Sequence, residues 1–509
     1  MRYSPGGRSD PAERLADSSR GKVRVDFRSS KADEGSVIGP STLRPMLPGV
    51  LSILGLLISP LLTAAEDSPK PPPAPNLIFF LADDLGWGDV GFHGGSIPTP
   101  NIDQLAKQGV RLEYFYVQPV CTPTRGAFLT GRYPMRLGLQ TGVIRPWAKH
   151  GLPLDERTLP QALRDAGYAT AICGKWHLGH ASPEFLPTRR GFDQQYGHYN
   201  GAIDYFTHIR DGSHDWHQND TANHDQGYAT DLITKSAIKS IAEHNPDKPL
   251  FLYVPFNAPH TPLQAPAEWV AKFAHIENKN HRIYAAMVAC MDDAIGRILA
   301  TLDEHGFARE DTLVFFCSDN GGLTSIGSNG PLRGQKGRLY EGGIRVPAVI
   351  SWQGTLEGGQ TVNDPLHIVD LYPTFLHLAG AKLEQEKPLD GRDAWPVITK
   401  GEPRSRDFIL HNVTPWSGAL RMGKWKLLHN GNTPANATEG PAKDSWELFD
   451  MKADPNEKID LSLEHPEILA KLRTRLEALR KEAAPANIPP NVAPAGFKSP
   501  AVWGEPASH

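Results

Sequence analysis

The chain is poor in cysteine: it has four in 509 residues, too few for a disulfide-built scaffold. It has no basic excess either. Its 53 Lys and Arg residues are balanced by 57 Asp and Glu residues, so the overall charge does not favour nucleic acid as a partner. Its 48 glycines and 45 prolines follow no triplet period, which excludes a collagen-like repeat. The composition is otherwise typical of a globular protein of two or three domains.

The sequence also has no hydrophobic run long enough for a membrane span. The most apolar stretch, 46–65, has 11 residues between its two prolines, whereas a spanning helix needs about 20. An arginine precedes the stretch, and the small residues Thr63 and Ala65 occupy positions −3 and −1 of a cleavage site. We therefore expect residues 1–65 to be an N-terminal extension and signal peptide, and the mature protein to be periplasmic or secreted, without a stable membrane span.

A Pro-rich tether at 66–75 leads into a region, 76–400, in which short apolar runs alternate with amphipathic segments. This alternation indicates an α/β fold with a large, mainly parallel sheet covered by helices on both faces. Strands are expected at 76–82, 168–173, 250–255 and 312–317, and helices at 101–108, 158–167, 228–243, 282–305 and 366–379.

The pattern changes after residue 400. Short strands separated by turns are expected at 408–411, 419–421, 425–429 and 446–449, followed by a helix at 466–481. This order predicts a smaller C-terminal subdomain at 401–484, built from an antiparallel sheet plus a helix. Residues 485–509 are rich in Pro and Ala and are expected to form an extended tail.

Two acidic clusters follow predicted strands. Asp83 and Asp84 come directly after the first strand, and Asp319 and Asn320 stand just after the fourth. Ligand sites in open parallel sheets gather beyond the carboxyl ends of the strands. A bound cation would relieve the repulsion between adjacent carboxylates, and oxygen donors favour Ca²⁺ or Mg²⁺ over zinc. The alternative is that these residues only cap and shape turns.

Polar residues also follow the other two predicted strands. Lys175 and His177 come after the second strand, and His260 after the third. The same end of the sheet should therefore carry cationic and titratable groups beside the acidic clusters. Because the chain as a whole is slightly acidic, an anionic substrate must be attracted by such local charge.

The most informative stretch is 119–132, in which Cys121 and Arg125 stand at a transition from loop to helix. By physical chemistry alone, a cysteine beside an arginine could be an activated thiolate or an inert buried thiol. The string Cys-x-Pro-x-Arg followed by Leu-Thr-Gly-Arg resembles the signature of the type I sulfatases. Thr124 stands where Ser or Ala is commoner in that family.

The resemblance extends over nearly all of 76–484. Further similar segments are found at 83–89, 174–179, 255–260, 318–322, 332–347 and 447–457. The segment 186–193 most resembles the arylsulfatase B branch, the N-acetylgalactosamine-4-sulfatases. The resemblance implies an alkaline-phosphatase-like fold and hydrolysis of sulfate esters, with a sulfated saccharide as the substrate.

The family also implies a modified cysteine and a metal ion. A formylglycine-generating enzyme would convert Cys121 to formylglycine, whose hydrate is the nucleophile. The implied ligands of a Ca²⁺ ion, or possible Mg²⁺ ion, are Asp83, Asp84, Asp319, Asn320 and one oxygen of modified Cys121.

The remaining roles implied by the resemblance fall on cationic and imidazole side chains. Arg125 would stabilise the hydrate, and Lys175 and Lys336 would hold the sulfate. His260 would protonate the leaving alcohol, aided by Lys336. His177 would accept the proton whose removal expels sulfate.

Two other functions fit parts of this pattern. A cation, a nucleophile and paired lysines would also suit a phosphoester or phosphonate hydrolase of the same superfamily. A non-catalytic glycan-binding protein could keep the fold, but it would be expected to lose Cys121, Arg125 or a metal carboxylate, and all are present. Trp147, Trp216 and Trp416 are expected to pack against other side chains; the alternative is that they stack on sugar rings.

Overall fold

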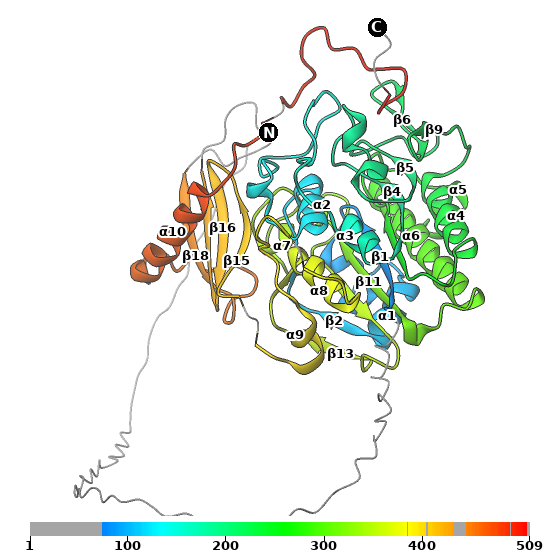
Figure 1. Cartoon of the computed structure of the whole chain (residues 1–509). Helices are drawn as coiled ribbons and strands as arrows, with labels where there is room; N and C mark the ends of the chain where they lie inside the picture. The colour runs from blue at the N-terminus through cyan, green and yellow to red at the C-terminus, as the bar shows by residue number, and fades with distance from the viewer. Residues whose placement is uncertain (1–73, 384, 404–405, 432–443, 489, 506–509) are drawn as a thin grey trace, which may run out of the picture. The chain divides into compact units, whose positions relative to one another are not determined.

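The computed structural model describes residues 74–383, 385–403, 406–431, 444–488 and 490–505 (Figure 1). The predicted extension and signal peptide at 1–65, and most of the tether at 66–75, lie outside the described residues. Within the described part of the chain, no helix is both long and apolar enough to cross a membrane.

A ten-stranded sheet forms the centre of the large domain. Its strands run in the order β13 (Gln360–Val362), β2 (Val110–Leu112), β12 (Ala348–Ser351), β11 (Thr312–Ser318), β1 (Asn76–Ala82), β10 (Leu250–Pro255), β4 (Ala169–Lys175), β5 (Gln194–His198), β8 (His217–Gln218) and β9 (Thr221–Ala222). The central strands from β11 to β5 are parallel, and β12, β2, β8 and β9 join by antiparallel pairing. The predicted mainly parallel sheet is therefore confirmed.

The alternating side chains of β1 divide between two hydrophobic cores. Leu77, Phe79 and Leu81 point into one core, whereas Ile78 and Phe80 point into the other. All five are fully buried, as expected for a strand covered on both faces. The first core is covered by α2 (Cys121–Thr130), α3 (Leu159–Asp165) and α8 (Leu371–Leu378). The second is covered by α1 (Pro100–Gln108), α4 (Ala229–Ala242), α5 (Ala267–Lys272) and α6 (Lys279–Glu304).

One predicted helix is wrong in its first half. The segment expected to be helical at 366–379 begins as the short strand β14 (Leu366–His367), which pairs with β3 (Phe115–Tyr116). A 3₁₀ turn, η7 (Ile368–Asp370), follows and leads into α8. His367 and Asp370 form a reciprocal capping arrangement that starts this turn, and Pro373 lies in the first turn of α8. Strand pairing and capping thus overrule the apolar pattern.

The predicted small antiparallel sheet is present. It consists of β15 (Ile409–Val413), β16 (Ser417–Met422), β17 (Trp425–Asn430) and β18 (Ser445–Asp450), paired in that order. Gly423 closes the β16–β17 hairpin with a φ of 58°, which glycine adopts without steric cost. Helix α10 (Pro466–Lys481) packs on one face of the sheet, in contact with β15, β16 and β17. Figure 1 shows this layer beside the large domain.

The other face of the small sheet docks on the large domain around a buried ion cluster. Lys426 of β17 is fully buried, and its Nζ lies 2.9 Å from Oε1 of Glu341 and 2.6 Å from Oε1 of Glu457. Glu341 begins α7 (Glu341–Ile344) of the large domain and accepts a hydrogen bond from the Tyr116 hydroxyl at 2.9 Å. Burial raises the pKa of Glu457 to about 7, although Lys426 acts in the opposite direction.

The described residues of the C-terminal tail form no regular helix or long strand, but they pack against the large domain. The backbone N–H of Asn487 donates to the carbonyl of Gly138 at 3.0 Å. Near its end, Trp503 is only 2% exposed, and its indole N–H donates to the carbonyl of Arg210 at 2.8 Å. Arg210 belongs to a two-stranded ribbon of β6 (Ile209–Arg210) and β7 (Ser213–His214).

Candidate active site

The two acidic clusters meet because of the register of the central strands. β1 and β11 are adjacent and parallel, and Ala82 pairs with Ser318. The residues that follow each strand, Asp83 and Asp319, therefore leave the same edge of the sheet side by side. Asp84 has a φ of 67°, an uncommon conformation for a residue with a side chain. Its backbone N–H donates to Oδ1 of Asp319 at 3.2 Å, which ties the clusters together.

Cys121 lies directly over these carboxylates, at the first residue of α2. Its Sγ is 3.5 Å from Oδ1 of Asp83 and 3.7 Å from Nζ of Lys336. The side chain is buried, with an exposed fraction of 1%. Burial, Asp319 and Asp83 together raise the pKa of the thiol, against the effect of the nearby lysines. The surroundings thus favour the neutral thiol over an activated thiolate.

Arg125 lies one helical turn after Cys121 and faces the same site. Its Nε and Nη2 both donate to Oδ2 of Asp319, at 3.1 and 2.9 Å. Its Nη1 donates to the carbonyl of Lys175 at 2.9 Å. The whole of α2 is buried, so the guanidinium is fixed by the packing of the helix as well as by these hydrogen bonds.

Two lysines bring further positive charge to the carboxylates. Nζ of Lys175, at the end of β4, is 2.5 Å from Oδ2 of Asp83. Nζ of Lys336 is 2.6 Å from Oδ1 of Asp84. Burial would raise the pKa of Asp84, but Lys336 and His260 outweigh it and hold this pKa below its usual range. In return, the carboxylates raise the pKa of Lys336 despite its burial, so Lys336 stays protonated.

The hydrogen bond of His177 fixes its tautomer. Its Nε2 lies 3.0 Å from the carbonyl of Ile144, so Nε2 carries the proton and donates it. Its Nδ1 is buried and makes no hydrogen bond to the described residues. Burial and then Lys175 and Arg125 lower the pKa of His177 well below its ordinary value. His177 is therefore neutral, with an unprotonated Nδ1 that can accept a proton.

His260 lies beside Asp84. Its Nδ1 lies 2.5 Å from the carbonyl of Thr261 and so donates to it, while Nε2 is 3.6 Å from Oδ2 of Asp84. Burial and Lys336 lower the pKa of His260 to about 3. His260 is thus neutral in the free site, and it can donate a proton from Nε2 only after a bound anion has raised this pKa.

The acidic residues provide a donor set that fits a hard divalent cation. Ligand atoms of Asp83, Asp84, Cys121 and His260 all lie within 4.8 Å of one another. The buried Oδ1 of Asn320 has no hydrogen-bond partner among the described residues, while its Nδ2 donates to Oδ1 of Asp84 at 2.7 Å. An unpartnered buried carbonyl oxygen beside two carboxylates is chemically suited to Ca²⁺ or Mg²⁺.

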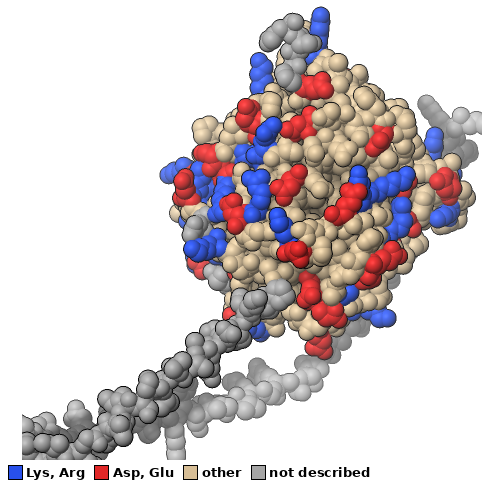
Figure 2. Space-filling view, turned by 45° about the vertical axis from the view of Figure 1, so that its right-hand side comes forward, with Lys and Arg blue, Asp and Glu red and all other residues tan. Residues whose placement is uncertain are grey.

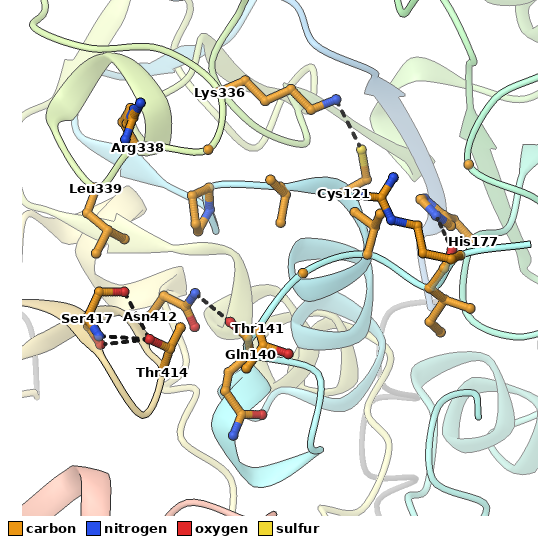
Figure 3. A pocket seen from close by; sticks show the side chains of 18 of the residues that line it. Cys121, Gln140, Thr141, His177, Lys336, Arg338, Leu339, Asn412, Thr414 and Ser417 are labelled. Atoms are coloured by element: carbon orange, nitrogen blue, oxygen red, sulfur yellow. Dashed lines mark hydrogen bonds between the residues drawn. The ribbon is translucent and has the colours of Figure 1, made fainter. Parts of the chain in front are cut away.

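A cavity of about 390 Å³ opens over Cys121. Its floor carries four of the predicted site residues: Cys121, His177, His260 and Lys336. Figure 3 shows Lys336 pointing toward the sulfur of Cys121. The structure thus brings all ten predicted site residues into one region, and their individual roles stay predictions.

The walls of the cavity include residues that sequence reasoning missed. They come partly from the loop at 140–146 and partly from the turn between β15 and β16, with Arg145, Arg210, Asn412, Thr414 and Trp416 among them. Trp416 lines the cavity, in agreement with the alternative of sugar stacking and not with the packing that we expect first, whereas Trp216 is fully buried as expected. Nothing in the sequence near these residues indicates that separate loops converge here.

The chain matches known sulfatases along most of its length. Residues 75–381 match the family described as Sulfatase, and residues 335–482 match the C-terminal domain of N-sulphoglucosamine sulphohydrolase. Arylsulfatase J of Mus musculus is 40% identical over 464 residues, which cover 82% of this chain and 77% of the relative. N-acetylgalactosamine-6-sulfatase of Mus musculus is 35% identical and covers 74% of each chain.

Solved structures agree with this assignment. The crystal structure of Ps i-CgsB in complex with k-i-k-neocarrahexaose has a TM-score of 0.73 and 34% sequence identity, covering 81% of this chain and 94% of that one. The PsFucS1 sulfatase from Pseudoalteromonas sp. has a TM-score of 0.66 and 27% identity, covering 82% of this chain and 92% of that one. The chain therefore belongs to the type I sulfatase family and is a sulfuric ester hydrolase.

Proposed function

We propose that this sulfatase removes sulfate groups from a sulfated saccharide through a formylglycine derived from Cys121 and a divalent cation. The observation that carries the proposal is the position of Cys121: its Sγ lies between Oδ1 of Asp83 and Nζ of Lys336 at the floor of the cavity. The cation would be held by oxygens of Asp83, Asp84, Asp319, Asn320 and modified Cys121. The modified residue would supply a hydrated aldehyde as nucleophile, and the cation would supply positive charge that polarises the sulfuryl group.

The cationic side chains would neutralise the substrate. A sulfate ester repels an anionic nucleophile, so the site must compensate negative charge before the reaction can proceed. Lys336 and Lys175 would each bind sulfate oxygens, since both ammonium groups already face the carboxylates around Cys121. Arg125 would hold the modified residue in place, because its guanidinium is fixed between Asp319 and the carbonyl of Lys175.

The two histidines would move protons at different times. His260 would donate from Nε2 to the oxygen of the leaving alcohol, once the bound sulfate has raised its depressed pKa. Lys336, which lies beside the same carboxylate, would assist. His177 would accept a proton at its free Nδ1 in the step that releases sulfate, and its neutral state suits this role.

The relatives support a saccharide as the substrate. One relative is an N-acetylgalactosamine-6-sulfatase, and one solved structure holds a neocarrahexaose. The cavity over Cys121 has Trp416 and several polar side chains in its walls, a lining that suits a sugar ring. A sulfated galactosamine is the first substrate to test.

The proposal includes the maturation and location of the enzyme. A formylglycine-generating enzyme would act on Cys121, and a signal peptide within residues 1–65 would direct the chain to the periplasm or out of the cell. The layout of the stretch at 46–65 supports export.

Mass spectrometry and sulfate release test the proposal together. In active enzyme, the peptide that contains Cys121 should be about 18 Da lighter than the thiol form, because CHO replaces CH₂SH in the nucleophile. The same preparation should release sulfate from N-acetylgalactosamine sulfate. Full activity in a preparation that contains only unmodified thiol would refute the mechanism, and faster turnover of the matching phosphate ester would favour a phosphoester hydrolase.

A further inference from the structure

The cavity over Cys121 is positively charged in a protein that is slightly acidic overall. Among the residues that line it, four are cationic, and none is Asp or Glu; the cationic ones are Arg145, Arg210, Lys336 and Arg338. On the face shown in Figure 2, by contrast, basic and acidic side chains are mixed. The four cations therefore make the cavity itself a region of positive charge.

Lys336 is paired with the buried carboxylate of Asp84, whereas Arg145 and Arg210 have no buried carboxylate partner among the described residues. Nη2 of Arg145 meets an uncharged group, the side-chain oxygen of Asn491, at 3.2 Å. Arg210 has a carboxylate neighbour at 3.2 Å, Asp211, but that side chain is 44% exposed, so solvent screens the pair. Burial and the charge of Arg210 lower the pKa of Arg145. An anion between the two guanidinium groups would relieve this repulsion.

The position of Arg145 links it to the reacting groups. Its chain neighbour Ile144 accepts the hydrogen bond that fixes the tautomer of His177. The N–H of Ile144 is in turn bound by the hydroxyl oxygen of Thr122, the residue after Cys121, at 3.2 Å. Arg145 is thus held at a fixed place relative to the nucleophile, on the wall of the same cavity.

The C-terminal tail forms hydrogen bonds to both Arg145 and Arg210. Asn491 accepts the hydrogen bond from Arg145, and the neighbouring Trp147 donates its indole N–H to the carbonyl of Pro490 at 2.9 Å. Farther along the tail, the indole N–H of Trp503 donates to the carbonyl of Arg210. The backbone N–H of Trp503 donates to the carbonyl of His214 at 2.9 Å. The tail therefore contacts the side chain of Arg145 and the backbone of Arg210, two residues from different loops.

We propose that Arg145 and Arg210 form a second anion subsite, which binds a further sulfate or carboxylate group on the same saccharide whose sulfate ester is cleaved at Cys121. Asn491 and Trp503 are positioning residues for this subsite. The inference rests on the proposed function and narrows its substrate class to saccharides with at least two negative groups. Guanidinium groups suit both oxyanions, since they donate paired hydrogen bonds to either.

The test compares substrates that differ only in their second charge. These are nitrophenyl sulfate, a monosulfated N-acetylgalactosamine, its disulfated form, and a disaccharide in which a uronate adjoins the sulfated sugar. The wild-type enzyme should favour one or both of the last two. Arg145→Gln and Arg210→Gln should raise KM for the favoured substrate by about 10–100-fold, the loss expected for one charge-assisted hydrogen bond. On nitrophenyl sulfate, which carries no second charge, these variants should lose much less kcat/KM than on the favoured substrate.

Matched variants separate charge from structure. Arg189→Gln removes an arginine that is 64% exposed and paired with Asp220, and should leave KM unchanged on every substrate. Asn491→Asp places a carboxylate beside Arg145 with almost no change in shape. It should raise KM for the doubly charged substrate more than Asn491→Ala does, a difference that a purely structural role would not produce.

Three outcomes would overturn the subsite. The first is a wild type with equal kcat/KM for singly and doubly charged saccharides. The second is an equal loss of kcat/KM on all substrates in the two arginine variants. The third is a KM for the doubly charged substrate that is no higher in Asn491→Asp than in Asn491→Ala. In each case sulfate release by the wild type would leave the proposed function standing. Calorimetric binding of the disulfated saccharide to Cys121→Ser, with and without Arg145→Gln, tests the subsite independently of turnover; equal affinities would refute it.

Discussion

Arg125 and Asp319 form a buried ion pair in which two nitrogens of the guanidinium donate to the same carboxylate oxygen, Oδ2. The other oxygen, Oδ1, accepts the backbone N–H of Asp84. Asp319 therefore links the helix that begins at Cys121 to the acidic cluster at Asp83 and Asp84. The geometry of the site depends on the planar, forked shape of the arginine as much as on its charge.

Replacing this arginine by lysine should be damaging. Arg125→Lys keeps the charge, but an ammonium cannot reproduce both hydrogen bonds to Oδ2 of Asp319 and the one to the carbonyl of Lys175. We expect kcat/KM for sulfate release to fall by about 10²–10³-fold, as when one preorganised donor is removed from an active site. Arg189→Lys, at an exposed position, is the control. Activity within twofold of wild type in Arg125→Lys would show that charge alone suffices.

Replacing His260 and replacing His177 should impair different steps of the reaction. His260→Ala removes the proposed donor to the leaving oxygen, so it should reduce cleavage of a saccharide sulfate far more than cleavage of nitrophenyl sulfate, whose leaving group needs no proton. The difference should be about 10²–10⁴-fold, the usual range for general acid catalysis. His177→Ala should slow sulfate release from either substrate and let a sulfated enzyme accumulate, which mass spectrometry would detect. Equal losses of activity on both substrates in His260→Ala, together with no sulfated enzyme in His177→Ala, would refute these roles.

A single methyl group should displace His177. A Cβ added at Gly201 would lie 2.2 Å from Cε1 of the His177 ring, so the ring must move in Gly201→Ala. We expect this variant to reproduce the slow sulfate release of His177→Ala, with KM less affected than kcat. The thermal midpoint of both variants should be recorded alongside. Wild-type kcat in Gly201→Ala would mean that the position of the ring is unimportant.

The cation should stabilise the folded protein. A ligand at about 100 times its Kd adds about 2.7 kcal/mol to the free energy of unfolding, so Ca²⁺ should raise the thermal midpoint of chelator-treated protein. Asp84→Asn should abolish most of this gain, whereas Asp165→Asn, at a carboxylate that is 60% exposed, should retain it. Repeating the titration with Mg²⁺ identifies the preferred ion. The same gain in Asp84→Asn as in the wild type would place the ion elsewhere.

The ion cluster beneath the small sheet should make stability depend on pH. The pKa of Glu457 is raised to about 7 in the folded protein, so its stabilising effect is complete at low pH and is lost as the pH rises through 7. The wild type should lose about 1–2 kcal/mol of unfolding free energy between pH 5.5 and 8 relative to Glu457→Gln. Urea unfolding at both pH values measures this difference. Parallel curves for the two proteins would assign the pH dependence to other groups.

The site was predictable where it depends on the central sheet. Once 76–82 and 312–317 are recognised as buried parallel strands, Asp83 and Asp319 must leave the same edge. The spacing of four between Cys121 and Arg125 places both on one face of a helix. These relationships depend only on strand pairing and helical geometry, which hydrophobic patterns reveal.

The walls of the cavity depend on contacts that the sequence does not express. Trp416 lines the cavity because the turn between β15 and β16 faces the large domain. Asn491 of the tail, which binds Arg145, is more than 300 residues away from it in the sequence. The wrong helix at 366–379 has a similar origin, since Leu366 pairs with Phe115, a distant residue. Long-range packing decides such details, and periodicity within one segment cannot show them.

The burial of Cys121 sets an order of events during biosynthesis. In the folded protein the thiol is 1% exposed, at the start of a wholly buried helix and at the bottom of a cavity of about 390 Å³. The active site of another protein could not reach the thiol there. The proposed conversion of Cys121 would therefore have to take place before α2 packs against the sheet. Under this proposal, a chain that folds first would keep the thiol, and the rate of folding would limit how much of the protein can become active.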